Sequence, residues 1–117
     1  MSKQLNISKH EVANMYKFCF YVPETHLEAV KEAVFAVGAG KIGDYDYCSW
    51  QAKGEGQFRP LVGSKPFIGK EGKVEKVIEY LVEMVCADEF IKNAVNALKE
   101  AHPYEEPAYN VIKLEDI

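Results

Sequence analysis

The sequence has few cysteines and no long apolar stretch. Its three cysteines, Cys19, Cys48 and Cys86, form no C-x-x-C pair, which excludes a zinc knuckle and a thioredoxin-type motif. We expect reduced thiols, with Cys19 and Cys86 as small core residues and Cys48 as the most reactive one. The apolar runs are far shorter than the ~20 residues of a membrane helix, and residues 1–15 lack the apolar segment of a signal peptide. We therefore expect a cytoplasmic protein with no membrane partner.

An excess of positive charge is also missing. The chain has 14 basic and 18 acidic residues, a net charge of −4, and no run of five like charges. Because nucleic-acid binding depends on clustered Lys and Arg, no nucleic-acid partner is expected. A length of 117 residues with 48% apolar and 27% charged residues is typical of one globular domain. We expect a tail over residues 1–14 and a single domain over residues 15–117.

The first half of the domain begins with a strand and a helix. Alternation of aromatic and polar residues predicts a strand over residues 15–22, which Pro23 ends. Thr25 and Glu28 have the spacing of a capping box, and apolar residues at helical spacing follow them. Gly38 is a natural stop for that helix.

The middle of the chain predicts a β-hairpin. Residues 45–52 and 57–62 alternate in the manner of strands, and the turn-forming residues 54–56 (Gly-Glu-Gly) lie between them. Residues 73–85 are ambiguous, because their apolar spacing suits a helix while residues 80–85 also alternate. A clear helix begins directly after this segment, with Asp88 as its expected N-cap. Two abutting helices would leave the hairpin without enough strands to pair with, so we predict a strand over about 78–85.

The helix that follows ends by Ala101, and residues 107–114 predict a last strand. The resulting fold class is α+β. We predict a ferredoxin-like βαββαβ arrangement, in which two helices cover one face of an antiparallel sheet.

Three ordered stretches make the domain specific. They are residues 38–50, which read GAGKIGDY and later YCSW, residues 54–69, which begin GEGQFRPL, and residues 101–109, AHPYEEPAY. In this order they closely resemble the YqfO-type domain, which many proteins of the Nif-three-like family carry as an insert within a dinuclear-metal domain. The resemblance covers about residues 15–115.

This resemblance implies a fold related to the PII signalling proteins and the CutA divalent-cation-tolerance proteins, which are ferredoxin-like and commonly trimeric. It also supports the strand before Cys86. The chain matches the insert alone, so the resemblance does not carry over the dinuclear metal chemistry of the host proteins. A separate protein, such as a metal domain encoded elsewhere, is a candidate partner.

Two glycine-rich segments invite a nucleotide or anion interpretation. Gly38, Gly40 and Gly43 spell G-x-G-x-x-G, but they follow a helix and lead into a strand, the reverse of a dinucleotide fingerprint. We interpret them as a helix end and a tight turn. The second segment is the loop from Gly63 to Lys73, where backbone N–H groups and lysine ammonium groups can hold an anion. The candidate residues of this loop are Gly63, Lys65, Gly69 and Lys70, and the alternative is a solvated surface loop.

The segment His102-Pro103-Tyr104-Glu105-Glu106 is the sharpest candidate site. An imidazole and carboxylates suit a divalent transition metal, so His102, Glu105 and Glu106 are candidate ligands, with a further donor from elsewhere. The alternative is structural: the prolines shape the turn, Tyr104 packs down, and His102 binds the last helical carbonyls. Adjacent glutamates in an extended segment point to opposite faces, which disfavours acid–base catalysis.

The function we predict is that of a non-catalytic PII/CutA-like module that self-associates and senses or binds a small ligand. Trp50, Phe58 and Phe67 are the candidate interface residues, and the resemblance favours a trimer. The alternative is a metal-tolerance-like protein that binds a divalent metal ion at the 102–106 segment. We predict no catalytic residues. Glutamates at 75, 79 and 83 would share one strand face, open to solvent or to a subunit edge.

Overall fold

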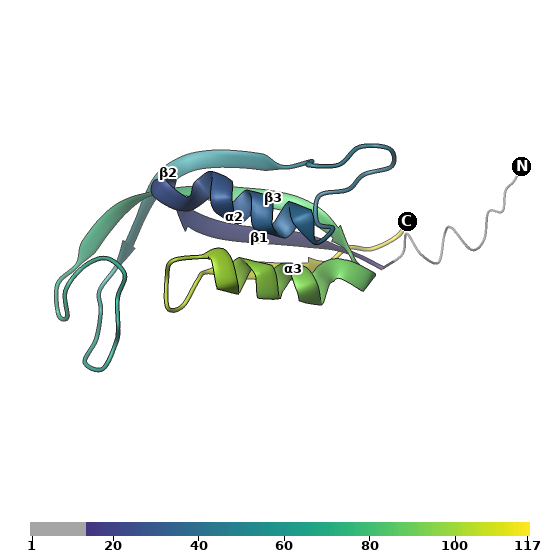
Figure 1. The fold of residues 1–117 in the computed structure, drawn as a ribbon. Coiled ribbons are helices and arrows are strands. Elements are labelled where there is room, and N and C mark those ends of the chain that lie inside the picture. The colour runs from purple at the N-terminus through teal and green to yellow at the C-terminus, as the bar shows by residue number, and fades with distance from the viewer. Residues whose placement is uncertain (1–13) are drawn as a thin grey trace, which may run out of the picture.

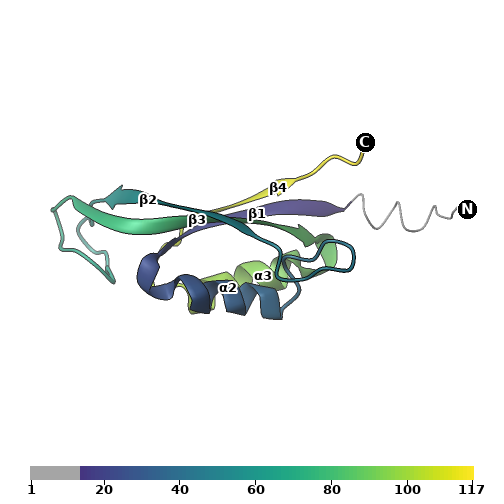
Figure 2. The ribbon, with the colours of Figure 1, turned by 90° about the horizontal axis from the view of Figure 1, so that it is seen from above.

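The computed structural model describes residues 14–117, so the predicted tail, apart from Asn14, lies outside the described residues. These residues form a four-stranded sheet with two α-helices on one face (Figures 1 and 2). The elements are β1 (Met15–Pro23), the 3-10 turn η1 (Glu24–His26), α2 (Leu27–Ala36), β2 (Trp50–Phe58), β3 (Glu75–Ala87), α3 (Asp88–Ala101) and β4 (Tyr109–Lys113). The strand order is β2-β3-β1-β4, and every neighbouring pair is antiparallel. This confirms the predicted βαββαβ fold.

The core lies between the sheet and the helices. Alternate side chains of β1, such as Phe18 and Phe20, are fully buried, and so is Val82 of β3. Helix α2 contributes Val30 and helix α3 contributes Leu98 to the same cluster. Burying one such side chain stabilises a fold by about 1.5–3 kcal/mol. Segments with an apolar residue at every second position therefore form strands, and segments with apolar residues at helical spacing form helices, because each then buries its apolar side chains on one face. Among the described residues, no helix has the length and apolar character needed to cross a membrane.

The predicted hairpin is wrong. Strand β2 runs without interruption through residues 54–56, and Gly54 and Gly56 pair with Glu79 and Val77 of β3. Gly56 lies close to a bulky neighbour, because a Cβ there would overlap the carboxylate of Glu79, whereas Gly54 has open space around it. Residues 45–49 form no strand.

Of these residues, Tyr45 ends a tight turn in which it bridges Ile42. Tyr47 has a positive φ of 57°, and its ring stacks on Phe35 at 4.6 Å between centroids. The tyrosine hydroxyl also donates to Glu32 of α2. These contacts hold Tyr47 in a conformation that a strand excludes.

The strand interpretation of the ambiguous segment is confirmed. Strand β3 is longer than predicted, since it begins at Glu75 and ends at Ala87. Val82, Met84 and Cys86 alternate into the core, and the long register with both β1 and β2 explains why the sheet prevails over the helical spacing. Strand β4 is shorter than the predicted residues 107–114.

The helix starts differ from the predicted caps. Thr25 makes no capping bond, because η1 precedes α2 and the threonine hydroxyl contacts His26 instead. Asp88 is the first residue of α3 rather than its N-cap, which is Ala87. The Asp88 carboxylate accepts a hydrogen bond from the Tyr16 hydroxyl at 3.2 Å.

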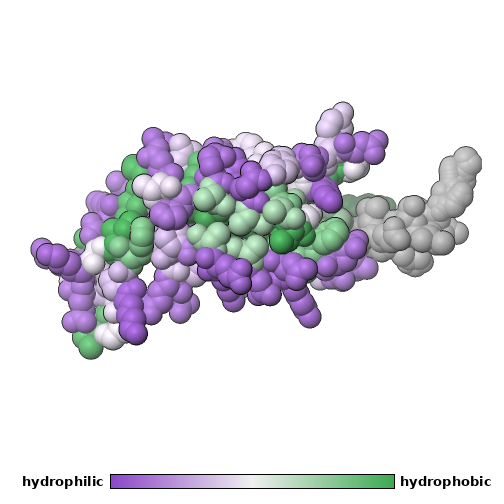
Figure 3. Space-filling view, in the orientation of Figure 1, coloured by the Kyte–Doolittle hydropathy of each residue, from purple (hydrophilic) through white to green (hydrophobic). Residues whose placement is uncertain are grey.

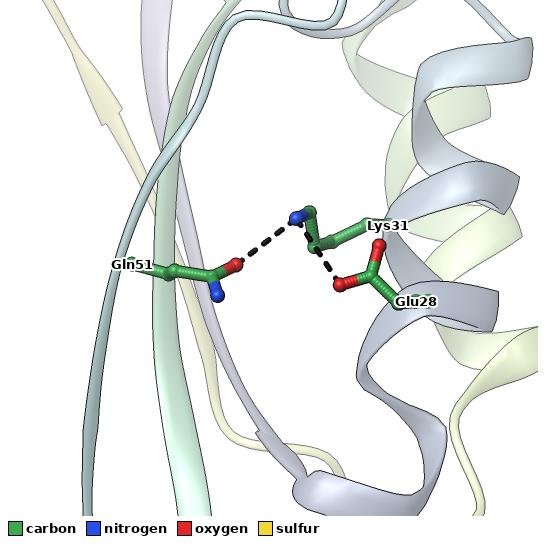
Figure 4. Close-up of polar contacts among 3 residues, drawn as sticks. All are labelled: Glu28, Lys31 and Gln51. Atoms are coloured by element: carbon green, nitrogen blue, oxygen red, sulfur yellow. Dashed lines mark hydrogen bonds and ion pairs between the residues drawn. The ribbon is translucent and has the colours of Figure 1, made fainter.

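Polar contacts attach the edge strand β2 to helix α2. The Lys31 ammonium donates to Gln51 Oε1 at 3.0 Å and pairs with Glu28 at 3.6 Å (Figure 4). A second ion pair joins Lys53 of β2 to Glu24 at 3.3 Å. Seen from the helical side, apolar residues gather in the middle of the molecule, and hydrophilic residues flank them (Figure 3). Helix α3 is amphipathic, because it buries Ile91, Ala94 and Leu98 and exposes polar residues on its other side.

Candidate functional site

The turn between α3 and β4, residues 102–108, is organised by a buried histidine. His102 is 5% exposed. Its Nδ1 accepts a hydrogen bond from the Tyr104 N–H at 3.1 Å, and its Nε2 lies 2.7 Å from the Tyr21 carbonyl oxygen. Because that oxygen can only accept, the ring is neutral and carries its proton on Nε2. Burial lowers the pKa of His102, against smaller raising effects of the Tyr21 carbonyl and Glu79.

The predicted structural alternative needs one correction. The His102 side chain bonds to the backbone of β1, not to the last helical carbonyls. It is the backbone N–H of His102 that donates to Leu98 O, at 2.8 Å. The histidine therefore fastens the end of α3 to the sheet.

The same geometry bears on the predicted metal ligands. Both ring nitrogens of His102 are engaged, so neither has a lone pair free for a cation. Glu105 and Glu106 are exposed beside it. Within residues 14–117, no three His, Cys, Asp or Glu side chains come together at metal-binding distance. The metal role of His102, Glu105 and Glu106 stays a prediction that this arrangement does not favour.

Tyr104 connects the turn to the sheet. Its ring lies 5.9 Å from that of Phe58 and 6.4 Å from that of Phe67, between centroids. Its hydroxyl donates to Glu79 Oε2 at 2.9 Å. Burial and the Glu79 carboxylate raise the pKa of Tyr104 well above its ordinary value. The tyrosine is thus a neutral donor that packs down between two strands and a loop.

The loop between β2 and β3, residues 59–74, here called the arm loop, closes over this turn. The backbone N–H of Lys65 donates to Glu105 Oε1 at 3.0 Å. The Phe67 ring meets His26 edge-on at 5.4 Å between centroids. The N–H of Lys65, one of the groups predicted to hold an anion, is therefore already bonded to the Glu105 carboxylate.

The other predicted anion-loop residues do not converge on a cradle. Gly63 and Gly69 both have positive φ, but Gly69 lies against the Glu75 carboxylate, whereas Gly63 faces open space. Lys70 is exposed. A carboxylate next to Gly69 opposes anion binding, so the anion role of Gly63, Lys65, Gly69 and Lys70 remains a prediction without geometric support.

A cavity of about 430 Å³ lies between the arm loop and the 102–108 turn. Aromatic and aliphatic side chains make most of its wall, and its charged groups come from both loops and from β2–β3. Its apolar and aromatic residues include Tyr21, Phe58, Leu61, Phe67, Ile68 and Tyr104, and its charged residues are Arg59, Glu79, Glu105 and Glu106. Phe58 and Phe67, predicted as interface residues, are cavity residues in this chain.

Sequence reasoning missed Tyr21, Arg59 and Glu79 as neighbours of the turn. Glu79 was predicted only to share a strand face with Glu75 and Glu83, which their register confirms. Even spacing identifies a face, but only the fold reveals that Tyr104 reaches Glu79 on it. No local pattern in the sequence predicts that contact, because the residues involved are far apart in the chain.

The sheet face opposite the helices is uncovered among the described residues. Trp50 of β2 (58% exposed), Ile112 of β4 (54%) and Tyr21 of β1 (40%) lie on it. An ion pair of Lys17 with Glu83, at 3.3 Å, lies on the same face. The predicted interface residue Trp50 is therefore placed where another surface can reach it.

The comparisons with known proteins place this geometry in context. No protein-family model matches the chain. The GTP cyclohydrolase 1 type 2 homolog of Mycobacterium leprae is 46% identical over 103 residues, which cover 88% of this chain and 27% of the relative. That of Bacillus subtilis is 40% identical over 121 residues, which cover 98% of the chain and 32% of the relative. The chain thus spans about a quarter to a third of these curated relatives.

Solved structures agree. A NIF3-related protein of Bacillus cereus superposes with a TM-score of 0.73 and 37% identity, over 86% of this chain and 25% of that one. The periplasmic divalent cation tolerance protein CutA of Archaeoglobus fulgidus superposes with a TM-score of 0.60 over 86% and 84% of the two chains. At 16% identity the CutA likeness concerns the fold alone. By sequence and fold, the chain belongs to the NIF3/YqfO family, as the counterpart of one PII/CutA-like domain of its longer members.

Proposed function

We propose that this chain is a non-catalytic PII/CutA-like module that self-associates and binds a small ligand in the cavity between the arm loop and the 102–108 turn. The observation that carries the proposal is that cavity, about 430 Å³ in volume. Its size falls in the range of small-molecule sites, which are mostly apolar with a few polar groups. Its wall includes Tyr21, Phe58 and Glu79, which also lie on the uncovered sheet face.

Self-association is proposed through that uncovered face. A sheet that buries one side against helices and exposes Trp50, Ile112 and Tyr21 on the other has an apolar surface suited to a second copy. In addition, β1 ends at Pro23, opposite Glu79, so within residues 14–117 the first part of β3 pairs only with β2. An unpaired strand edge is a ready partner for another chain. The fold resemblance favours a trimer.

The cavity chemistry supports binding rather than catalysis. Ser64 is a potential nucleophile in its wall, but its hydroxyl donates to Leu61 O at 2.7 Å. Tyr104 is held neutral, and its proton is directed at Glu79. The activity mentioned in the name of the curated relatives is not carried to this chain, because the chain spans only 27% of the Mycobacterium leprae protein.

The alternative function, divalent-metal binding at the 102–106 segment, requires a change of geometry. His102 would have to release either the Tyr21 carbonyl or the Tyr104 N–H before it ligates a cation. We therefore rank it second. Replacing His102 by Ala tests it, since a bound metal ion would be lost while an assembly through the sheet would remain.

Native mass spectrometry of untagged protein, purified without chelator, tests the proposal first. We expect an oligomer, with added mass if a ligand copurifies. Trp50→Glu should dissociate the oligomer, whereas Ala29→Glu, at an exposed position of α2, should leave it intact. A monomer at tens of micromolar, or an oligomer that Trp50→Glu leaves unchanged, would contradict association through this face. An oligomer that binds neither metals, nucleotides nor the aromatic probes described below would contradict ligand binding.

A further inference from the structure

Three aromatic side chains form part of the cavity wall. Phe58 comes from the end of β2, Phe67 from the arm loop and Tyr104 from the 102–108 turn. The rings lie 5.9 and 6.4 Å from Tyr104, between centroids, and are tilted rather than stacked. Rings with this spacing are in contact with one another and form one continuous apolar wall, on which an apolar or flat body can pack, and ring faces attract cations.

The charges of the same cavity are mainly negative. Glu79, Glu105 and Glu106 contribute three carboxylates, and Arg59 contributes one guanidinium. Glu79 uses Oε2 for Tyr104, and Glu105 uses Oε1 for Lys65. Within residues 14–117 no ion pair joins Arg59 to these carboxylates. The net negative potential is therefore available to a bound molecule.

Resting on the ligand-binding function proposed above, we propose that the ligand class is a small organic cation with an aromatic body, such as an aromatic amine. The body packs against Phe58, Phe67 and Tyr104, and the cationic group faces Glu79 and Glu105. A positive charge in this place gains both from the carboxylates and from the ring faces, while an anion is repelled.

Other ligand classes fit the cavity less well. A phosphate-bearing molecule could pair with Arg59 but would lie among the carboxylates of Glu79, Glu105 and Glu106, and the Lys65 N–H is already bonded to Glu105. A divalent metal ion is strongly hydrated and needs several donors together, whereas no three potential ligands cluster in the described part of the chain. An organic cation needs neither a cradle of N–H groups nor a fixed coordination geometry.

The test uses three probes that share one ring system. They are 1-naphthylmethylamine, which is a cation at pH 7, the neutral 1-naphthalenemethanol and the anionic 1-naphthoate. Binding is measured on the full chain by ligand-observed NMR and by isothermal titration. We expect the amine to bind about tenfold more tightly than the alcohol, and the naphthoate to bind most weakly.

Variants locate the site. Phe58→Ala should weaken binding of both the amine and the alcohol, whereas Glu105→Gln should weaken the amine several-fold and leave the alcohol unchanged. Glu89→Gln, at an exposed position of α3, is the matched control and should alter neither. Equal binding of amine and alcohol, or tighter binding of naphthoate, would overturn the charge inference while the ligand-binding function survives. Failure of all three probes to bind the folded oligomer would overturn the inference and count against the ligand-binding function as well.

Discussion

Replacing His102 by Ala perturbs the contact that fastens the end of α3 to the sheet. The ring is 5% exposed and bonds to two backbone groups, the Tyr21 carbonyl and the Tyr104 N–H. A buried polar group left without a partner costs about 1–3 kcal/mol. With two such groups and the lost packing of the ring, we expect His102→Ala to lower the free energy of unfolding by about 3–5 kcal/mol.

Urea unfolding followed by circular dichroism measures this loss. It should be done with a chelator present and at one fixed protein concentration, because association adds to apparent stability. With a slope of about 1–3 kcal/mol per molar urea, the midpoint should fall by about 1–5 M. His102→Gln, whose amide offers a donor and an acceptor, should recover part of the loss. His26→Ala, at a less buried histidine, should cost much less.

The same residue predicts a pH dependence. Burial lowers the pKa of folded His102 below its ordinary value of 6.5, so the unfolded chain binds the proton more readily. Stability from this group is fully present above pH 6.5 and is lost as pH falls through the folded pKa. Glu79 and His26 act on the ring with opposite signs. A loss of less than about 1 kcal/mol in His102→Ala with chelator, or no reduction of the acid sensitivity in His102→Gln, would refute the hydrogen-bond reasoning.

Two further predictions concern other parts of the fold. Gly38→Ala should lower the free energy of unfolding by more than about 2 kcal/mol, because the glycine has a φ of +114° and a Cβ would lie 2.6 Å from the Phe90 ring. Gly43→Ala, at a position with open space around it, should cost only about 1 kcal/mol. Equal shifts of the melting temperature in the two variants would contradict this explanation. Iodoacetamide at pH 8 should alkylate the half-buried Cys48 first and Cys86 only on unfolding, because burial raises the pKa of the Cys86 thiol to about 11. The rates are followed by peptide mass spectrometry. Modification of Cys86 in the folded protein as fast as that of Cys48 would contradict the prediction.

The fold was largely predictable because its core follows local periodicity. Phe18 and Phe20 alternate in β1, and Leu98 lies on the apolar stripe of α3. The hairpin error has a physical cause: a Gly-x-Gly segment satisfies both the requirements of a turn and those of a strand that passes a bulky neighbour. Only the pairing of Gly56 opposite β3, next to Glu79, distinguishes the two.

The candidate site was predictable only in part. Residues 102–106 were recognisable as unusual, because an imidazole, two carboxylates and a proline within five residues are rarely incidental. The role of His102 was not, since the choice between ligating a metal and bonding a backbone depends on what lies opposite the ring. That neighbour, the Tyr21 carbonyl, is 81 residues away in the sequence. Non-local contacts of this kind leave no periodic trace.

The contacts of Tyr104 imply that the cavity and the sheet respond together. Its ring walls the cavity, its N–H donates to His102, and its hydroxyl donates to Glu79. A ligand that packs on the ring therefore favours the docked turn, and through His102 it favours the attachment of α3 to β1. A ligand at one hundred times its Kd stabilises a fold by about 2.7 kcal/mol, close to the expected cost of His102→Ala. Because the docked turn also forms the cavity wall, the same substitution should weaken ligand binding, although His102 itself does not line the cavity.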